Sequence, residues 1–295
     1  MDKKRTIFVN GGKVRDYRKH LGMSQSALAD GICTQATISL IEKQNKVPNM
    51  NTLISVAKRL NIGVEELIVR SLGYGEKQII SAEAQLQHYK FGRVLSLLGN
   101  IEEKQLEEIT LVQRYHYLLG TCALFYSRDL VTAAVHYSRV LATARRQISG
   151  VPIVVAKLGL ALTYAEMGKI DKTSLLVEEA SEAIKQLQPE INSYAGMDVT
   201  VLWYLACCYN RLGERDDALE TIKKAQQRAL ANGQLYLLDE IYSVYSECIR
   251  KMGGSRSNRM ANAAQDTALT LAKILGNRSL VNRVTSKSDE SVIAN

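Results

Sequence analysis

Residues 34–37, Thr-Gln-Ala-Thr, carry side chains that can recognise the edges of nucleic-acid bases. The amide of Gln35 presents a donor and an acceptor on one planar group, so it can pair with N6 and N7 of an adenine. Ala36 and the methyl group of Thr37 can make apolar contacts with thymine methyls. This chemistry requires that the four residues, Thr34 included, lie together on one exposed turn.

The residues around 34–37 predict such a turn. An apolar pair at 28–29 lies just before Gly31, where a helix can end in the left-handed conformation that glycine tolerates. Three residues later a threonine can cap a second helix, whose Ile38 and Ile41 would face inward. Two helices joined by so short a turn form a helix-turn-helix, whose second helix normally enters the DNA major groove.

Other polar residues in this region are candidates for contacts to the DNA backbone. Gln25 would begin the first helix of the motif, where a side chain and backbone N–H groups can hold a phosphate. Residues 1–70 contain seven Lys and five Arg against three Asp and three Glu, a net charge of +6, and the whole chain carries +8. This charge favours a polyanion partner for the N-terminal part only, although alone it fits solubility equally well. The remaining candidates are Ser39, Lys43, Asn45 and Lys46.

The same region resembles the lambda-repressor-like (XRE) family of DNA-binding domains. The resemblance implies a structural ion pair between Arg18 and Glu42 that links the first and third helices. One such domain reads few bases, so we expect a dimer on double-stranded DNA with half-sites about one helical turn, roughly 34 Å, apart. The matching positions are Gly11, Val14, Arg18, Ser24, Gln25, Leu28, Ala29, Ile38, Ser39, Ile41, Glu42, Pro48, Ala57, Leu60 and Leu67. The predicted core consists of Val14, Tyr17, Leu28, Ile38, Ile41, Leu53, Val56 and Leu60.

A repeated pattern in the rest of the chain predicts stacked helix pairs. Tyr-Ala-Glu-Met-Gly-Lys-Ile-Asp at 164–171 recurs as Tyr-Asn-Arg-Leu-Gly-Glu-Arg-Asp at 209–216, each between two helices with apolar periodicity. Weaker copies lie at 125–130 and 248–254. The segment 202–225 resembles a tetratricopeptide (TPR) repeat, although the spacing between breaks exceeds the ~34 residues of a minimal repeat.

Composition and pattern together predict an all-α protein with two domains. Apolar residues make up 46% of the 295 residues and there are only three Pro, which suits long helices around a sizeable core. We expect five helix pairs, beginning near residues 77, 104, 151, 196 and 235, and a last helix near 280–284 that caps the stack. The expected domains are a helix-turn-helix domain with a linker helix at 1–72, a TPR-like peptide-binding and dimerisation domain at 73–285, and a disordered tail at 286–295.

This organisation resembles the PlcR-like family of peptide-responsive quorum-sensing transcription regulators, most clearly at residues 32–42, 48–62 and 247–251. The resemblance implies a cytoplasmic receptor for a short signalling peptide, which switches the DNA binding of a homodimer. Residues at the family's peptide-anchoring positions differ here, so we expect a different and largely apolar peptide. The expected peptide contacts are Gln87, Lys90, Leu158, Leu162, Trp203, Tyr204, Cys207, Asn210, Arg211, Glu240 and Glu247, each of which could equally be a packing residue.

The sequence contains no spacing typical of a catalytic, metal or cofactor site. The four histidines are scattered, and there is no HExxH, phosphate-binding Gly loop or nucleophile elbow, so we expect neither an enzyme nor a cofactor. Five cysteines without CxxC spacing favour a reducing compartment. Without a signal peptide or a long apolar run, we expect a cytoplasmic protein with no membrane partner. Two alternatives stay open: a TPR adaptor acting through protein partners, and a prophage-type repressor without a peptide ligand.

Overall fold

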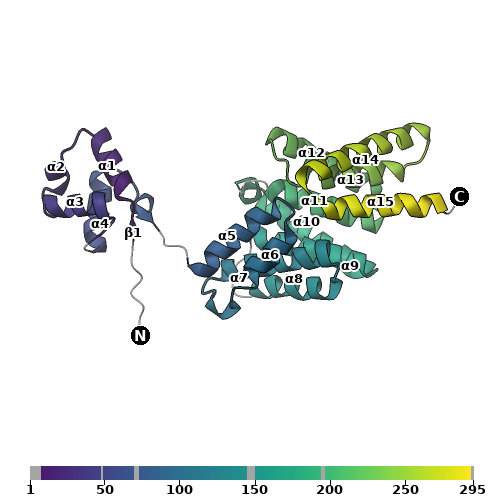
Figure 1. Ribbon diagram of the computed structural model, residues 1–295, viewed down its shortest axis with the longest axis horizontal. Coiled ribbons are helices and arrows are strands. Elements are labelled where there is room, and N and C mark those ends of the chain that lie inside the picture. Colours follow the sequence, from purple (N-terminus) through teal and green to yellow (C-terminus); the bar gives the residue numbers. More distant parts are fainter. Residues whose placement is uncertain (1–7, 48, 70–72, 145–149, 194–196, 294–295) are drawn as a thin grey trace. The chain divides into compact units, whose positions relative to one another are not determined.

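The chain forms two compact units, Met1–Gly73 and Tyr74–Asn295, one residue away from the expected boundary. The computed structural model describes residues 8–47, 49–69, 73–144, 150–193 and 197–293. Pro48, one of the positions that carry the XRE resemblance, lies outside the described residues. Each unit is mainly helical and has its own hydrophobic core (Figure 1).

The first unit, called the head below, contains four helices and a short antiparallel ladder. Asn10, Ser24, Thr34 and Asn49 each precede a helix, and each side chain accepts a hydrogen bond from the backbone N–H three residues later. These caps satisfy N–H groups that the first turn of a helix leaves unpaired. The elements are β1 Phe8–Val9, α1 Gly11–His20, α2 Gln25–Ala29, α3 Gln35–Gln44, α4 Met50–Arg59, the 3-10 turn η1 Val64–Glu66, and β2 Ile68–Val69.

The start of α1 lies directly against the end of α3. A Cβ atom on Gly11 would lie 2.8 Å from the Glu42 Cα, so a larger residue would push the two helices apart. The Gly11 N–H donates to Asn45 Oδ1 at 2.9 Å, and Asn45 ends α3 in the left-handed conformation at φ 56°. Gly11 therefore permits the close approach that fixes α3 in the head.

The predicted core of the head is confirmed except at Tyr17. Seven of the eight predicted residues are buried, whereas Tyr17 lies half-buried at the edge, where its hydroxyl donates to Glu66 at 2.9 Å.

The helix expected over 64–69 is wrong. Only Val64–Glu66 is helical, as a single 3-10 turn, and Ile68–Val69 then pairs with Phe8–Val9 as a strand. The β-branched Ile68 and Val69 favour this extended conformation, and buried Leu67 secures the turn before them. The expected linker helix therefore has no basis in residues 64–69.

The second unit, called the body below, consists of five helix pairs and a final helix, as the repeat predicted (Figure 1). The pairs are α5 Tyr74–Leu86 with α6 Phe91–Leu98, α7 Ile109–Cys122 with α8 Leu130–Ala144, α9 Val151–Glu166 with α10 Ile170–Ser193, α11 Met197–Leu212 with α12 Arg215–Ala231, and α13 Leu238–Arg250 with α14 Ser255–Leu275; α15 spans Arg278–Ile293.

The predicted breaks between paired helices are confirmed. Gly168 and Gly213 follow α9 and α11 with φ values of 72° and 84°, which glycine adopts without the steric cost of a Cβ. After α7 the chain makes a π-helical turn at Ala123–Ser127, and Arg128 takes the left-handed position with φ 56°.

The fully buried side chain of Tyr137 on α8 fills a space between α7 and α9. Added Cβ atoms would lie 3.0 Å from its ring at Gly120 and 2.6 Å at Gly159, so both glycines make room for the ring. Its hydroxyl lies 3.3 Å from those of Thr121 and Tyr204. These contacts join α7, α8, α9 and α11 in one core.

The C-terminal helix differs from the expected tail. We expected disorder from residue 286, but α15 continues to Ile293. Its first turns are held by the packing of Leu280 and Val284 against Ala272, and the helix extends beyond them. No helix among the described residues is long and apolar enough to span a membrane. All five cysteines are free thiols.

Candidate functional site

The predicted base-reading residues lie on the first turn of α3. Thr34 caps the helix by accepting from the Thr37 N–H at 3.2 Å, and its hydroxyl also contacts that of Thr37 at 2.9 Å. Gln35 and Ala36 are exposed, whereas Thr37 is half-buried. The turn therefore presents a Gln amide and two methyl-bearing residues to solvent, and base contact by them stays a prediction.

A chain of hydrogen bonds leads from the interior of the head to Gln35. The Arg18 guanidinium bonds both oxygens of Glu42, with Nε to Oε1 at 2.6 Å and NH2 to Oε2 at 3.0 Å. Glu42 Oε2 accepts from Gln25 Nε2 at 2.8 Å, and Gln25 Oε1 accepts from Gln35 Nε2 at 2.6 Å. The ion pair implied by the resemblance is present, and it orients the residue that we expect to read a base.

The Arg18–Glu42 pair is shielded from water. The Glu42 side chain is only 2% exposed and that of Arg18 is 10% exposed. Burial alone would raise the pKa of Glu42, but the hydrogen bonds from Arg18 and Gln25 outweigh it and lower that pKa. Arg18 also donates to the Met23 carbonyl at 2.7 Å, so the turn between α1 and α2 depends on the same pair. Removing one partner of such a pair leaves a buried charge without compensation.

The predicted backbone-contacting residues divide into two groups. Ser39 and Lys43 follow Gln35 at helical spacing, with Ser39 half-buried and Lys43 exposed, and Lys46 is exposed just after the helix. Asn45 instead uses its side-chain oxygen to bind the Gly11 N–H, and Gln25 lies between Glu42 and Gln35. Asn45 and Gln25 therefore have structural roles that the sequence did not predict.

Several predicted peptide contacts are buried in the body core. Leu158 and Leu162 are buried in its main hydrophobic cluster, and contact between them and a peptide stays a prediction. Cys207 is half-buried, and burial raises the pKa of its thiol well above the usual value. Leu158 and Leu162 both lie on α9, whose inward-facing apolar side chains contact the neighbouring helix pair.

Trp203 and Tyr204 line a small enclosed cavity of about 20 Å³. Their rings lie 4.9 Å apart and both contact Phe125. Trp203 Nε1 is buried and has no hydrogen-bond partner among the described residues. A cavity of this size holds about one water molecule, so it does not accommodate a peptide in this conformation.

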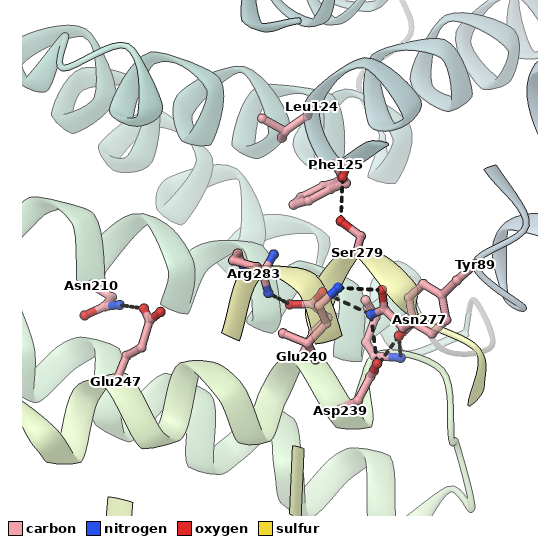
Figure 2. A network of polar contacts seen from close by, with 12 residues as sticks. Tyr89, Leu124, Phe125, Asn210, Asp239, Glu240, Glu247, Asn277, Ser279 and Arg283 are labelled. Atoms are coloured by element: carbon pink, nitrogen blue, oxygen red, sulfur yellow. Dashed lines mark hydrogen bonds and ion pairs between the residues drawn. The ribbon is translucent and has the colours of Figure 1, made fainter. Parts of the chain in front are cut away.

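A polar network beside this cavity joins the first helix pair of the body to the last (Figure 2). The Tyr89 hydroxyl donates to Asp239 Oδ1 at 2.5 Å and accepts from the Leu237 N–H at 3.0 Å. Asn277 donates to Asp239 at 2.8 Å and to Glu240 at 3.1 Å, and Arg283 donates to Glu240 at 2.5 Å. We call Tyr89, Asp239, Glu240, Asn277 and Arg283 the clasp.

Asp239, Glu240 and Asn277 of the clasp are buried, Tyr89 and Arg283 are half-buried, and the backbone at and beside the clasp is strained. Burial, and then the charge of Glu240, raise the pKa of Asp239. Tyr89 and Leu237 both adopt positive φ values, 54° and 69°, which non-glycine residues rarely adopt. Only Glu240 of this network was predicted as a site residue. The signal that could have pointed to the rest is the acidic pair 239–240 within an apolar helical pattern.

Asn210, Arg211 and Glu247, three of the other predicted polar contacts, already have polar partners on α9, α11 and α13. Asn210 donates to Glu247 at 3.0 Å (Figure 2). Arg211 donates to Glu166 at 2.9 Å. Lys251 donates to Asn210 Oδ1 at 2.7 Å. Gln87 and Lys90 are exposed near the turn between α5 and α6. Of the predicted contacts, Trp203, Tyr204 and Glu240 line one cavity, and peptide binding by any of the predicted residues stays a prediction.

Comparison with known proteins identifies the type of head and the fold of the chain. Residues 14–67 match the family model HTH_3, helix-turn-helix. The structure of PlcR from Bacillus thuringiensis in complex with the peptide PapR7 and DNA matches with a TM-score of 0.63 at 20% identity, over 92% of this chain and 98% of that chain. ComR from S. thermophilus, in complex with DNA and its signalling peptide ComS, matches with a TM-score of 0.51 at 15% identity, over 94% of this chain and 97% of that chain.

No curated protein matches the sequence. At these identities the two structures establish the fold: an XRE-type helix-turn-helix head followed by a TPR-type helical body.

Proposed function

We propose that this chain is a sequence-specific DNA-binding transcription regulator, active as a homodimer, whose operator affinity is changed by a short peptide bound to its body. One observation carries the DNA-binding part: Gln35 lies exposed on the first turn of α3 and is held there by the bonds that lead back to Arg18 and Glu42. Such preorganisation lets the side chain meet a base edge without first losing rotational freedom.

A dimer follows from the small size of one head. A single recognition helix contacts few bases and phosphates, so two heads on half-sites about one helical turn apart, roughly 34 Å, would supply the specificity of a regulator. The body is the candidate dimerisation element, because residues 64–69 form a turn and a strand inside the head.

The peptide-dependent part rests on the clasp and on the fold. A ligand shifts an equilibrium only if it binds two shapes of the protein differently. Bonds between residues 150 positions apart hold the body in one shape, and breaking them would give a second. The structures of PlcR and ComR described above are complexes with DNA and a peptide, which supports a peptide ligand here.

Selection of duplexes from a randomised pool tests the proposal. The full-length protein should enrich two half-sites about one helical turn apart. Sedimentation at micromolar concentration should show a dimer rather than only a species of the chain mass, 32.8 kDa. Enrichment of no sequence, or a monomer that binds a single half-site, would contradict it.

A further inference from the structure

A basic cleft on the body lies beside the clasp. It encloses about 1,040 Å³ and is bordered by the turn between α5 and α6, the π-helical turn, and the junction of α14 and α15. No Asp or Glu is among the residues that line it. Its five cationic side chains are those of Lys90, Arg93, Arg128, Arg278 and Arg283.

Three of these cations are available for a ligand. Arg128 pairs with Glu166 at 3.1 Å and Arg283 pairs with Glu240. Lys90, Arg93 and Arg278 are exposed, and none makes an ion pair with a described residue. Like charges gathered in a concave surface focus the field and attract an anionic group.

The cleft also has an apolar side. The Ile274 side chain is 74% exposed there, the highest value among the large hydrophobic residues. The rings of Phe91 and Tyr126 stack at 5.6 Å with an interplanar angle of 17°. A ligand that fits this lining must carry apolar groups as well as negative charge.

We propose that this cleft binds a short peptide that carries both acidic and apolar side chains. The identification of a peptide as the ligand rests on the proposed function. The lining of the cleft determines which peptide fits: one with acidic side chains, rather than the largely apolar peptide that the sequence suggested. A DNA duplex fits less well, because its phosphates lie on a convex surface that does not enter a concavity of this size.

The cleft and the clasp share two residues. Arg283 and Tyr89 line the cleft, and both hold carboxylates of the clasp. A ligand carboxylate that enters the cleft competes with Glu240 for the Arg283 guanidinium. Binding at this place therefore weakens the connection between the first and last helix pairs of the body.

Fluorescence anisotropy with the full-length protein tests this site. The probe is a fluorescein-labelled heptapeptide that alternates leucine and glutamate, and the matched probe has glutamine in place of glutamate. The glutamate probe should bind about tenfold more tightly than the glutamine probe. The double variant R93Q/R278Q should lose this difference, whereas K223Q/R259Q, which removes two exposed charges elsewhere on the body, should keep it.

Equal binding of the two probes, or an unchanged preference in R93Q/R278Q, overturns the proposal. A loss of random-duplex affinity in R93Q/R278Q, with glutamate-probe binding unchanged, would assign the cleft to the DNA backbone and also overturn it. If the probe binds in the cleft and operator affinity does not change, the site stands and the peptide-switch part of the proposed function fails.

Discussion

The head and the body present their candidate binding residues in opposite ways. In the head, Gln35 and Ala36 are exposed while the groups that orient them, Arg18 and Glu42, are buried. In the body, the predicted contacts Leu158, Leu162, Trp203 and Tyr204 are buried, and clasp residues line the same cavity as Trp203 and Tyr204. The comparison shows an exposed turn held by hydrogen bonds in the head, and predicted contacts that are packed in the core of the body.

The largest expected effect tests how the buried Arg18–Glu42 pair holds the head. Glu42→Ala leaves the Arg18 guanidinium buried without its partner and should destabilise the head by about 3–5 kcal/mol. Urea unfolding of the full-length protein, followed by a probe in the head, measures this loss. Glu65→Ala, at an exposed position, should change the stability little.

A double variant separates the stability of the head from its sequence preference on DNA. Arg18→Met with Glu42→Leu replaces the pair by apolar groups and should recover much of the lost stability. It should not recover sequence preference on DNA, because Gln25 then lacks the carboxylate that holds it. Recovery of both would show that the bonds to Gln35 do not orient it.

The next effect concerns packing in the body. Gly159→Ala places a Cβ 2.6 Å from the Tyr137 ring and should cost about 1–3 kcal/mol of unfolding free energy. Gly92→Ala is the matched control, since a Cβ there meets no atom within 4 Å, and it should be neutral or slightly stabilising. Thermal unfolding of both variants decides whether Tyr137 is as tightly enclosed as its contacts indicate.

A smaller effect should follow from breaking the clasp. Tyr89→Phe removes the hydroxyl that bonds Asp239 and Leu237, at a cost of about 0.5–1.5 kcal/mol per hydrogen bond. Hydrogen exchange should then accelerate at the start of α13 and leave α3 unchanged. Tyr74→Phe, at an exposed position, is the control. Unchanged exchange at α13 would mean that the clasp does not hold the body closed.

The smallest effect is a dependence of body stability on pH. His116 Nδ1 lies 3.1 Å from His136 Nδ1, and Glu103 and Arg139 face the pair. Burial lowers the pKa of both imidazoles, and with the charge of His116 it lowers the pKa of His136 to about 4.

Both rings are therefore neutral in the folded body, while the unfolded chain takes up protons below its ordinary histidine pKa of about 6.5. Stability should fall as the pH decreases from about 6.5 towards 4. His136→Gln should reduce the difference in melting temperature between pH 7.5 and pH 5.0, and His20→Gln in the head should not. Equal pH dependence in wild type and His136→Gln would exclude this pair as the source.

The sequence predicted local features well and long-range ones poorly. The helix-turn-helix, the cap at Thr34, and the glycine breaks of the repeat depend on neighbouring residues. Whether an apolar residue such as Leu158 faces a groove or the next helix pair depends on how the pairs stack. The clasp joins Tyr89 to Asp239, which lie 150 positions apart in the sequence, and no local pattern predicts such a contact.

The affinity of three proteins for two DNA molecules tests the central claim most directly. Wild type, Gln35→Ala and Gln44→Ala, the last altered at an exposed position at the other end of α3, are titrated at one salt concentration with the selected operator and with a random duplex. Gln35→Ala should lose about 1–3 kcal/mol on the operator and keep its affinity for random DNA, while Gln44→Ala matches wild type on both. Equal losses on both duplexes, or no loss on the operator, would contradict the claim that Gln35 is a preformed base-reading residue.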